Sequence, residues 1–270
     1  MVSWLKRWSL PWAFVYKNIK MKKCLLLFSL LLLFSQCEKP YDCVKSSGPT
    51  QSKVYDGLVF HKIRVNKRIA VVITQGTGTT NTVEVHAGES LINDIEVKVV
   101  DDFLVLTDNT TCNWVRDYGQ TVVYVTVSDL TDVYSKTEQT ISSNGVLRFN
   151  NLHLVSMDEI DGFKGTGNGD YNLTINNQSL LIENNDVSRY FITGTTTNLT
   201  VKFYEQGGIF HGENLLANNI SIFHRGSNDL FVYPLAKIEG DIYNIGNVYC
   251  FGHPPIDLVV QHYHGRMIYR

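Results

Sequence analysis

IENNDVSRYF (182–191), VKFYEQGGIF (201–210), IFHRGSNDLF (222–231) and IYNIGNVYCF (242–251) are four segments that share one spacing. Each begins with an aliphatic residue and ends with phenylalanine nine positions later. These phenylalanines, Phe191, Phe210, Phe231 and Phe251, follow one another at intervals of 19, 21 and 20 residues. A β-rich repeat of about this length without a helical part is typical of a β-helix, in which each coil lays its strands beside those of the previous coil.

The expected role of the four phenylalanines is an interior ladder. Strands of adjacent coils lie about 4.8 Å apart, so rings at equal positions stack and couple one coil to the next. A single coil cannot bury its apolar face, and the ladder would therefore extend the core along the stack. The spacing predicts that Phe191, Phe210, Phe231 and Phe251 lie over one another inside the fold.

The preceding part of the chain shows the two-residue apolar period of half-buried strands, most clearly at 69–73, 95–99 and 123–127. Clusters of glycine, asparagine and aspartate separate such segments, as at 165–170 and 226–229. We find no convincing helical period after residue 55, so the sequence predicts an all-β domain. The β-helix has coils of about 20 residues, and a β-sandwich, which also has short strands and frequent turns, stays open as the alternative.

The N-terminal segment has the features of a secretion signal. Lys22 and Lys23 precede an apolar run at 24–34, which is shorter than the roughly 20 residues of a membrane span. The run ends at Phe34-Ser35-Gln36-Cys37, which resembles a lipobox, although Gln36 is larger than the residue usual before the acylated cysteine. We predict lipidation at Cys37, with cleavage by an ordinary signal peptidase as the alternative. Two or more acyl chains would anchor the protein stably.

The leader divides the chain into three parts. We expect an N-terminal extension and lipoprotein-type signal peptide at 1–36, with Met21 as an alternative start, a tether at 37–55, and a single β-solenoid domain at 56–270. Charged residues at 38–42 resemble the signal that routes lipoproteins outward. The predicted location is therefore outside the inner membrane, lipid-anchored at the outer membrane or cell surface.

Charge and cysteine content argue against nucleic acid and zinc as binding partners. The leader holds six of the 24 basic residues and none of the 26 acidic ones, which leaves 18 basic against 26 acidic residues in the rest of the chain. Such an acidic chain is a poor partner for nucleic acid. Besides Cys37, the exported chain holds Cys43, Cys112 and Cys250, whose spacing matches no zinc site. Buried free thiols are favoured for Cys112 and Cys250, and a disulfide stays open.

The sequence holds no convincing catalytic or metal-binding set. Glycosidases need two carboxyl groups across one bond, and the candidate pair, Asp101-Asp102, is interpreted as a turn because consecutive strand residues face opposite ways. His253 between Gly252 and Pro254 also suits a turn. His262 and His264 share one face of the expected last strand but lack the third and fourth ligands of a metal site. We expect no catalytic residue, no cofactor and no metal.

Several segments resemble one protein family. The segment 246–254, GNVYCFGHP, is similar to the closing motif of the putative auto-transporter adhesin, head GIN domain family. FHKIRV (60–65), VVITQG (71–76), LINDIEV (91–97) and VVYVTV (122–127) resemble its first strands. The resemblance covers nearly all of 56–270, and it implies a right-handed parallel β-helix on a secreted lipoprotein with a role in adhesion. Few of the family's glycine-serine-glycine-aspartate turns survive, and no catalytic residues come with the resemblance.

These observations together predict a non-catalytic cell-surface lipoprotein that acts as an adhesin or as a glycan- or protein-binding module. Tyr243, Tyr249 and Tyr263 are the candidate exposed aromatics for binding, with ordinary strand packing as the alternative for each. The expected partners are a glycan or extracellular protein, and the membrane through the acyl anchor. The alternatives are a structural envelope component that pairs end to end through an exposed strand edge, and a carbohydrate-active enzyme on a β-helix scaffold.

Overall fold

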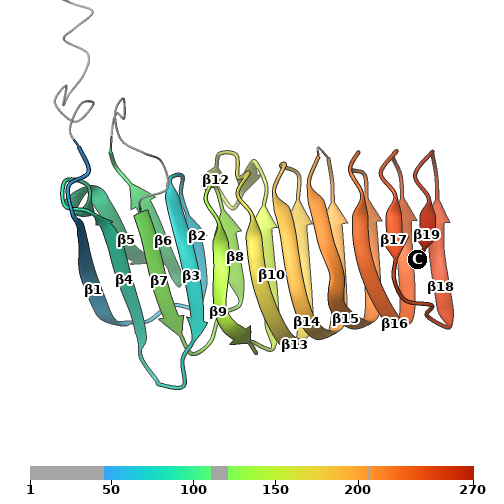
Figure 1. The fold of residues 1–270 in the computed structure, drawn as a ribbon, viewed down its shortest axis with the longest axis horizontal. Coiled ribbons are helices and arrows are strands. Elements are labelled where there is room, and N and C mark those ends of the chain that lie inside the picture. Colours follow the sequence, from blue (N-terminus) through green and yellow to red (C-terminus); the bar gives the residue numbers. More distant parts are fainter. Residues whose placement is uncertain (1–45, 111–120, 206) are drawn as a thin grey trace, which may run out of the picture. The chain divides into compact units, whose positions relative to one another are not determined.

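A computed structural model describes residues 46–110, 121–205 and 207–270. Among these residues, 17 strands form one mixed sheet and two more form a separate small sheet (Figure 1). The described residues contain one short 3-10 helix, η2 (Ile92–Asp94), and no helix with the length and hydropathy of a membrane span. The all-β prediction is confirmed. The predictions for 1–36, Cys37, Cys43 and Cys112 concern residues outside the described ranges.

The strands follow one another along the chain in this order: β1 (Thr50–Leu58), β2 (Lys62–Val65), β3 (Ile69–Gln75), β4 (Asn81–Gly88), β5 (Ile95–Val100), β6 (Phe103–Asp108), β7 (Thr121–Val127), β8 (Asp132–Ser135), β9 (Ile141–Leu147), β10 (Asn151–Ser156), β11 (Glu159–Ile160), β12 (Phe163–Lys164), β13 (Tyr171–Asn184), β14 (Arg189–Phe203), β15 (Ile209–His224), β16 (Leu230–Ile242), β17 (Val248–Cys250), β18 (Ile256–Gln261) and β19 (Met267–Tyr269).

The second half of the chain is a stack of parallel strands. β13, β14, β15 and β16 pair successively in parallel, and β16 then pairs with both β17 and β18. Tyr171, Tyr190, Phe210 and Leu230 occupy equivalent positions, which gives steps of 19, 20 and 20 residues. The coil length read from the sequence is therefore correct in this half.

The first half mixes strand directions. β1 pairs with β4, β4 with β7, and β5 with β6 in antiparallel fashion. β2 and β3 instead pair in parallel with β6, β7, β8 and β9. These strands therefore do not form a uniformly parallel arrangement. Nor do the described strands divide into the two facing sheets of a sandwich, because 17 of them belong to one sheet.

The domain begins earlier than the sequence indicated. β1 starts at Thr50 and pairs with β4 from Thr50 opposite Gly88 onward, so 50–55 belong to a strand and not to a tether. Its residues are almost all exposed, because β1 carries polar side chains on both faces. Such a strand lacks the apolar alternation by which strands are recognised in a sequence.

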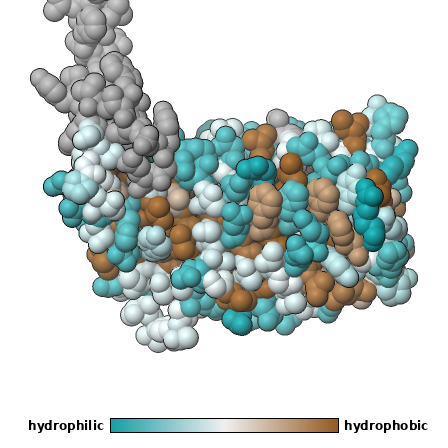
Figure 2. Space-filling view, in the orientation of Figure 1, coloured by the Kyte–Doolittle hydropathy of each residue, from teal (hydrophilic) through white to brown (hydrophobic). Residues whose placement is uncertain are grey.

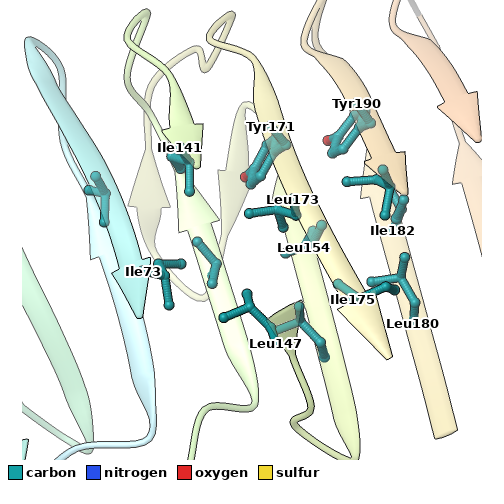
Figure 3. Close-up of a cluster of buried hydrophobic side chains, with 14 of the residues drawn as sticks. Ile73, Ile141, Leu147, Leu154, Tyr171, Leu173, Ile175, Leu180, Ile182 and Tyr190 are labelled. Carbon is teal, nitrogen blue, oxygen red and sulfur yellow. The ribbon is translucent and has the colours of Figure 1, made fainter. Parts of the chain in front are cut away.

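The core is filled by the side chains on one face of the strands, where every second residue is buried. Tyr171 and Tyr190 are fully buried, with their rings stacked at a centroid distance of 4.8 Å and an interplanar angle of 8° (Figure 3). The Tyr171 hydroxyl donates to the Val155 carbonyl at 3.0 Å, and the Tyr190 hydroxyl donates to Asn184 Oδ1 at 3.2 Å. Both buried hydroxyls therefore have the partner that burial requires.

The prediction that the four phenylalanines form an interior ladder is wrong, because they do not all point into the core. Phe210 is fully buried, but its partners in the neighbouring strands are Tyr190 and Leu230. Phe191 and Phe231 pair instead with His211 and lie half-buried on the outer face. The spacing of 19 residues from Phe191 to Phe210 is one short of the real step at that position. A slip of one residue moves a strand side chain to the opposite face.

Two glycines permit bends in the long strands. Gly194 has φ +109° and Gly240 has φ +122°, values that side-chain-bearing residues rarely adopt. A Cβ atom would also collide with the carbonyl oxygen of Ile175 at the first position and of Ile222 at the second. Only glycine fits where the neighbouring coil approaches so closely.

Candidate functional site

The outer face carries a first row of aromatic rings, Phe191, His211, Phe231 and Tyr249. Successive centroids are 4.8, 4.9 and 5.2 Å apart, and the interplanar angles are 5°, 4° and 10°. Strands of adjacent coils have almost this separation, so in-register rings lie flat on one another. Each ring face inside the row is covered by the next ring. This row therefore offers ring edges, and it mainly joins the coils.

A second row consists of Tyr204, Phe223, Tyr243 and His262. Tyr204 and Phe223 are 5.6 Å apart with a 51° tilt, and Phe223 and Tyr243 are 5.2 Å apart with a 54° tilt. The Tyr243 and His262 rings are stacked at 4.3 Å, and His262 Nε2 lies 2.7 Å from Asp241 Oδ1. His262 therefore covers one face of the Tyr243 ring, while the tilted contacts with Phe223 leave the tyrosine rings of this row partly open.

Beside the second row lies a shallow pocket of about 380 Å³, which we call the tyrosine pocket. Tyr204 and Glu205 follow β14, Arg225 follows β15, and Tyr243 and Asn244 follow β16. The backbone amides of Tyr204, Arg225 and Tyr243 each donate to a carbonyl of the preceding coil at 2.8 Å. The coils thus turn at matching points, and this brings residues about 20 positions apart in the sequence to one place.

Within the described part of the chain, the Arg225 guanidinium and the Glu205 carboxylate have no hydrogen-bond or ion-pair partner. Asn244 Nδ2 donates to the Arg225 carbonyl oxygen at 2.9 Å, which fixes the turn but leaves the guanidinium free. The pocket therefore combines two aromatic rings with a free cation, a free carboxylate and an amide. Figure 2 shows polar and apolar residues interspersed on the face in view.

Tyr204 is held by Glu183. Its hydroxyl donates to Glu183 Oε1 at 2.5 Å, and burial, this hydrogen bond and the carboxylate charge all raise the tyrosine pKa. Burial alone would raise the pKa of Glu183, but the hydrogen bond from Tyr204 and the charges of Lys202 and His153 lower it below its usual value. Glu183 is therefore a fixed anion that orients the tyrosine ring.

A charged chain continues from Glu183 across the neighbouring coils. His153 Nε2 lies 2.9 Å from Glu183 Oε2, and His153 Nδ1 lies 3.1 Å from Asp132 Oδ1. Burial would raise the pKa of Asp132, but hydrogen bonds from His153 and Thr131 and the charge of Lys62 lower it. Both ring nitrogens of His153 therefore contact a carboxylate, and these contacts link β10 to its neighbours β8 and β13.

The structure separates the three predicted tyrosines. Tyr243 lines the tyrosine pocket, with 39% of its surface exposed. Tyr249 ends the first row under Arg270, whose guanidinium is 4.9 Å from the ring centroid. Tyr263 is 56% exposed and lies against His264 after β18. Strand packing thus explains Tyr249, and the structure does not bring the three together.

Sequence reasoning missed Tyr204 and Arg225. The signal was present, because both lie three residues after the aliphatic residue of a repeat, Val201 and Ile222. These aliphatic positions are true register partners along with Ile182. The next partner is Gly240 and not Ile242, and three residues beyond it lies Tyr243.

The remaining sequence predictions are placed as follows. Asp101 and Asp102 have φ of +48° and +69° in the turn between β5 and β6, as expected, and Asp102 accepts the His61 amide at 3.0 Å. Cys250 is a buried free thiol whose Sγ is 3.1 Å from the Gly252 carbonyl oxygen. Among the described residues no group of three or more histidine, cysteine or acidic side chains is arranged to hold a metal ion.

The fold defines a class, the all-β domains with one large mixed sheet, whose second half here consists of parallel strands about 20 residues apart. The chain belongs to the family of the putative auto-transporter adhesin, head GIN domain, whose model matches residues 59–254. The resemblance noted in the sequence is thereby confirmed. No curated protein matches the chain in sequence.

Solved structures share the fold. A putative adhesin from Bacteroides fragilis is 19% identical, with a TM-score of 0.73 over 84% of this chain and 100% of that one. A putative adhesin from Parabacteroides merdae is 15% identical, with a TM-score of 0.63 over 85% and 99%. A putative adhesin from Parabacteroides distasonis is 13% identical, with a TM-score of 0.56 over 83% and 99%. At these identities the likeness concerns the fold alone.

Proposed function

We propose that this protein is a non-catalytic cell-surface adhesin that binds a glycan in the tyrosine pocket. The observation that carries the proposal is the placement of Tyr204 and Tyr243 beside Arg225 and Glu205, whose charged groups have no partner among the described residues. A sugar ring has an apolar C–H face and a rim of hydroxyl groups. It therefore suits a site with aromatic rings and a few polar groups that can donate and accept hydrogen bonds. The family's description as an adhesin agrees with this role.

A glycan array tests the proposal, followed by calorimetric titration of the best ligand. We expect saturable binding that Tyr243→Ala weakens at least about tenfold, equivalent to about 1.4 kcal/mol. Arg225→Gln should have a similar effect, because it removes the charge and the paired donors. Tyr124→Ala is the matched control, because Tyr124 is 40% exposed against 39% for Tyr243 and lies on β7. Array signals that persist in Tyr243→Ala would show that the tyrosine pocket is not the binding site. A blank array together with binding to extracellular-matrix proteins would show that the ligand is not a glycan.

The proposal includes export and anchoring. It assigns 1–36 to the leader and Cys37 to acylation at the outer membrane or cell surface. Metabolic labelling with an alkyne fatty acid should mark the wild-type protein and not Cys37→Ser, which should move from the membrane fraction to the soluble fraction. Equal labelling of both proteins would contradict it. We also assign the coils of the second half to a right-handed parallel β-helix, and a crystal structure with left-handed coils would contradict this assignment.

A structural envelope role is the second candidate, favoured by the last coil. β18 pairs only with β16 among the described strands, and its outward side chains Ile256, Leu258 and Val260 are 47%, 58% and 52% exposed. An apolar edge strand with unpaired backbone groups favours pairing with another copy. Light scattering should then show dimers that dissociate in Leu258→Lys. A protein that stays monomeric at high concentration would exclude this role.

A further inference from the structure

A second cavity, of about 490 Å³, lies on a different set of elements and collects positive charge. Lys67 follows β2, Lys136 follows β8 and Lys164 ends β12, and all three line this cavity. Its volume falls in the usual range for a site that takes one small molecule, about 300 to 1,000 Å³. We call it the lysine cavity.

Lys136 is the unusual member of the cavity. Only 5% of its surface is exposed, and its ammonium group has no hydrogen-bond partner and no carboxylate within ion-pair distance among the described residues. Gly165 packs against the aliphatic stem, and the ammonium group lies 5.4 Å from the centroid of the Phe163 ring. Buried charges are normally paired with an opposite charge, whereas this ammonium group has only a cation–π contact with the Phe163 ring among the described residues.

The acidic residues around Lys136 act on its ammonium group from a distance and form no ion pair with it. Burial lowers its pKa, while the more distant Asp186, Asp158 and Glu159 act to raise it. Asp186 is the carboxylate with the largest effect, and it accepts the Gly167 amide at 2.9 Å. The site thus holds a cation that nearby acids influence but do not contact.

The two acidic residues of the cavity are committed to other groups. Asp108 Oδ2 lies 3.3 Å from Arg68 Nε, and its other oxygen accepts the Thr110 amide at 2.8 Å. Glu138 accepts the Arg68 amide and the Gln139 side-chain amide, both at 3.1 Å. Neither carboxylate makes an ion pair with a cavity lysine.

The other two lysines and the loop after β12 supply further groups that can bind a ligand. Lys67 makes no ion pair with a described residue, and Lys164 pairs only with Glu159 at 3.4 Å on the exposed rim. Thr166 and Asn168, on the loop after β12, add a hydroxyl and an amide to the lining. Three cations with neutral donors are the groups that recognise an oxyanion.

We propose that the lysine cavity binds a monosaccharide unit that carries a carboxylate or a sulfate group. The anionic group would pair with Lys136, the hydroxyls would meet Thr166 and Asn168, and Lys67 and Lys164 would close the rim. The inference goes beyond the tyrosine pocket and does not rest on it, because the two sites share no residue.

Calorimetric titration of the purified protein with glucuronate and galactose 6-sulfate tests the site. Glucose is the uncharged control, and inorganic sulfate separates a sugar-borne anion from the free ion. We expect saturable binding of at least one acidic sugar, at least about tenfold weaker binding of glucose and of inorganic sulfate, and weaker binding at high salt. Equal affinity for inorganic sulfate would refute the claim that the site recognises a sugar. Failure to bind any of these anions would refute the claim that the cavity is a binding site.

Variants separate binding from folding. Lys136→Met keeps the aliphatic stem and should reduce affinity for the acidic sugar at least about tenfold, and the exposed Lys67→Gln should reduce it severalfold without affecting the fold. Lys98→Gln, an exposed lysine on β5, is the matched control and should leave binding unchanged. The lysine side-chain NMR signal that disappears in Lys136→Met should shift on addition of ligand. Unchanged affinity in both cavity variants, or an unshifted signal, would refute the proposal.

Discussion

His224 is an ionisable side chain placed where a charge is unfavourable. It ends β15, is fully buried, and packs edge-on against the Phe203 ring at 6.3 Å. Burial lowers its pKa from 6.5 to about 4, against the smaller opposing effects of the Asn228 backbone and the Asp229 charge. The folded state therefore holds this imidazole neutral over most of the pH range in which the unfolded chain protonates it.

This difference predicts a loss of stability in mild acid. Between pH 6.5 and 4 the unfolded state binds more protons than the folded state, so the free energy of unfolding falls as pH falls. From pH 7 to pH 5 the loss from His224 should be about 2 kcal/mol. His224→Leu should lack this part of the slope, whatever its stability at pH 7. Urea denaturation at both pH values measures it.

The pH range and the control isolate the histidine. The lowered pKa values of Asp132 and Glu183 affect stability only as pH falls below about 4.5, so pH 5 lies above their range. His253→Leu, at an exposed histidine, should keep the wild-type slope. Equal slopes in wild type and His224→Leu would show that the folded protein protonates the buried imidazole as readily as the unfolded chain does, so that the charged ring finds a partner.

At the scale of single residues, the sequence predicted chemistry better than position. The turn at Asp101 and Asp102 and the free thiol of Cys250 followed from their neighbours and spacing. The partnership of Tyr243 with Arg225 could not be read in the same way, because it depends on register between coils. A site assembled from three coils is visible in a sequence only after every coil length is known to the residue.

At the scale of elements, the first aromatic row makes packing between coils measurable. Phe231 has a stacked ring on both sides, His211 at 4.9 Å and Tyr249 at 5.2 Å, whereas Phe191 has one stacked ring, His211 at 4.8 Å, and the Arg189 guanidinium 5.8 Å from its centroid. Both phenylalanines are half-buried on the outer face. The pair therefore compares the centre and the end of one row at similar burial.

We expect Phe231→Ala to destabilise the protein more than Phe191→Ala. A stacked aromatic pair contributes about 0.5–1.5 kcal/mol beyond area burial, and the first variant loses one more such pair than the second. Urea denaturation, with a shared slope against denaturant, gives the difference in the free energy of unfolding. Equal losses would mean that the rings merely cover the sheet and do not couple the coils.

The same row shows why element faces were harder to predict than coil lengths. The aliphatic positions Ile182, Val201 and Ile222 are in register as expected. Six residues separate Phe203 from Phe210, whereas five separate the partners of these residues on each neighbouring strand, so Phe210 faces the core while Phe191 and Phe231 lie on the outer face. Phenylalanine is stable in both places, because the outer row also gives it aromatic neighbours. Its identity alone therefore does not indicate the face.

At the scale of the whole domain, the sequence did not indicate whether neighbouring strands pair in parallel or antiparallel. Apolar alternation in β4, β5 and β7 is the same for parallel and antiparallel neighbours, so it predicts strands without predicting partners. The repeat exists only in the second half, where every coil pairs in parallel with the one before. The antiparallel strands β1, β4 and β5 carry no repeat. The stacked region was thus predictable and its beginning was not.

The stacked region also ends unevenly. β14 is paired on both sides, with β13 and β15, whereas β18 and β19 have a partner on one side only among the described strands. Asp257 and Gln261 of β18 stand in register with the buried Ile238 and Ile242 of β16. Polar side chains thus replace the core at this end. In a stack of this kind each coil is stabilised by its neighbours, so the last coil should open separately from the rest.

Hydrogen exchange followed by mass spectrometry tests this expectation. Peptides from 256–269 should exchange at least about 100-fold faster than peptides from 190–203, equivalent to opening at least about 3 kcal/mol more easily. The measurement should be made at two protein concentrations, because end-to-end pairing through β18 would slow exchange only at the higher one. Uniform protection of both segments in dilute protein would mean that the last coil opens only with the whole domain. The polar residues at its inner positions would then have no energetic consequence.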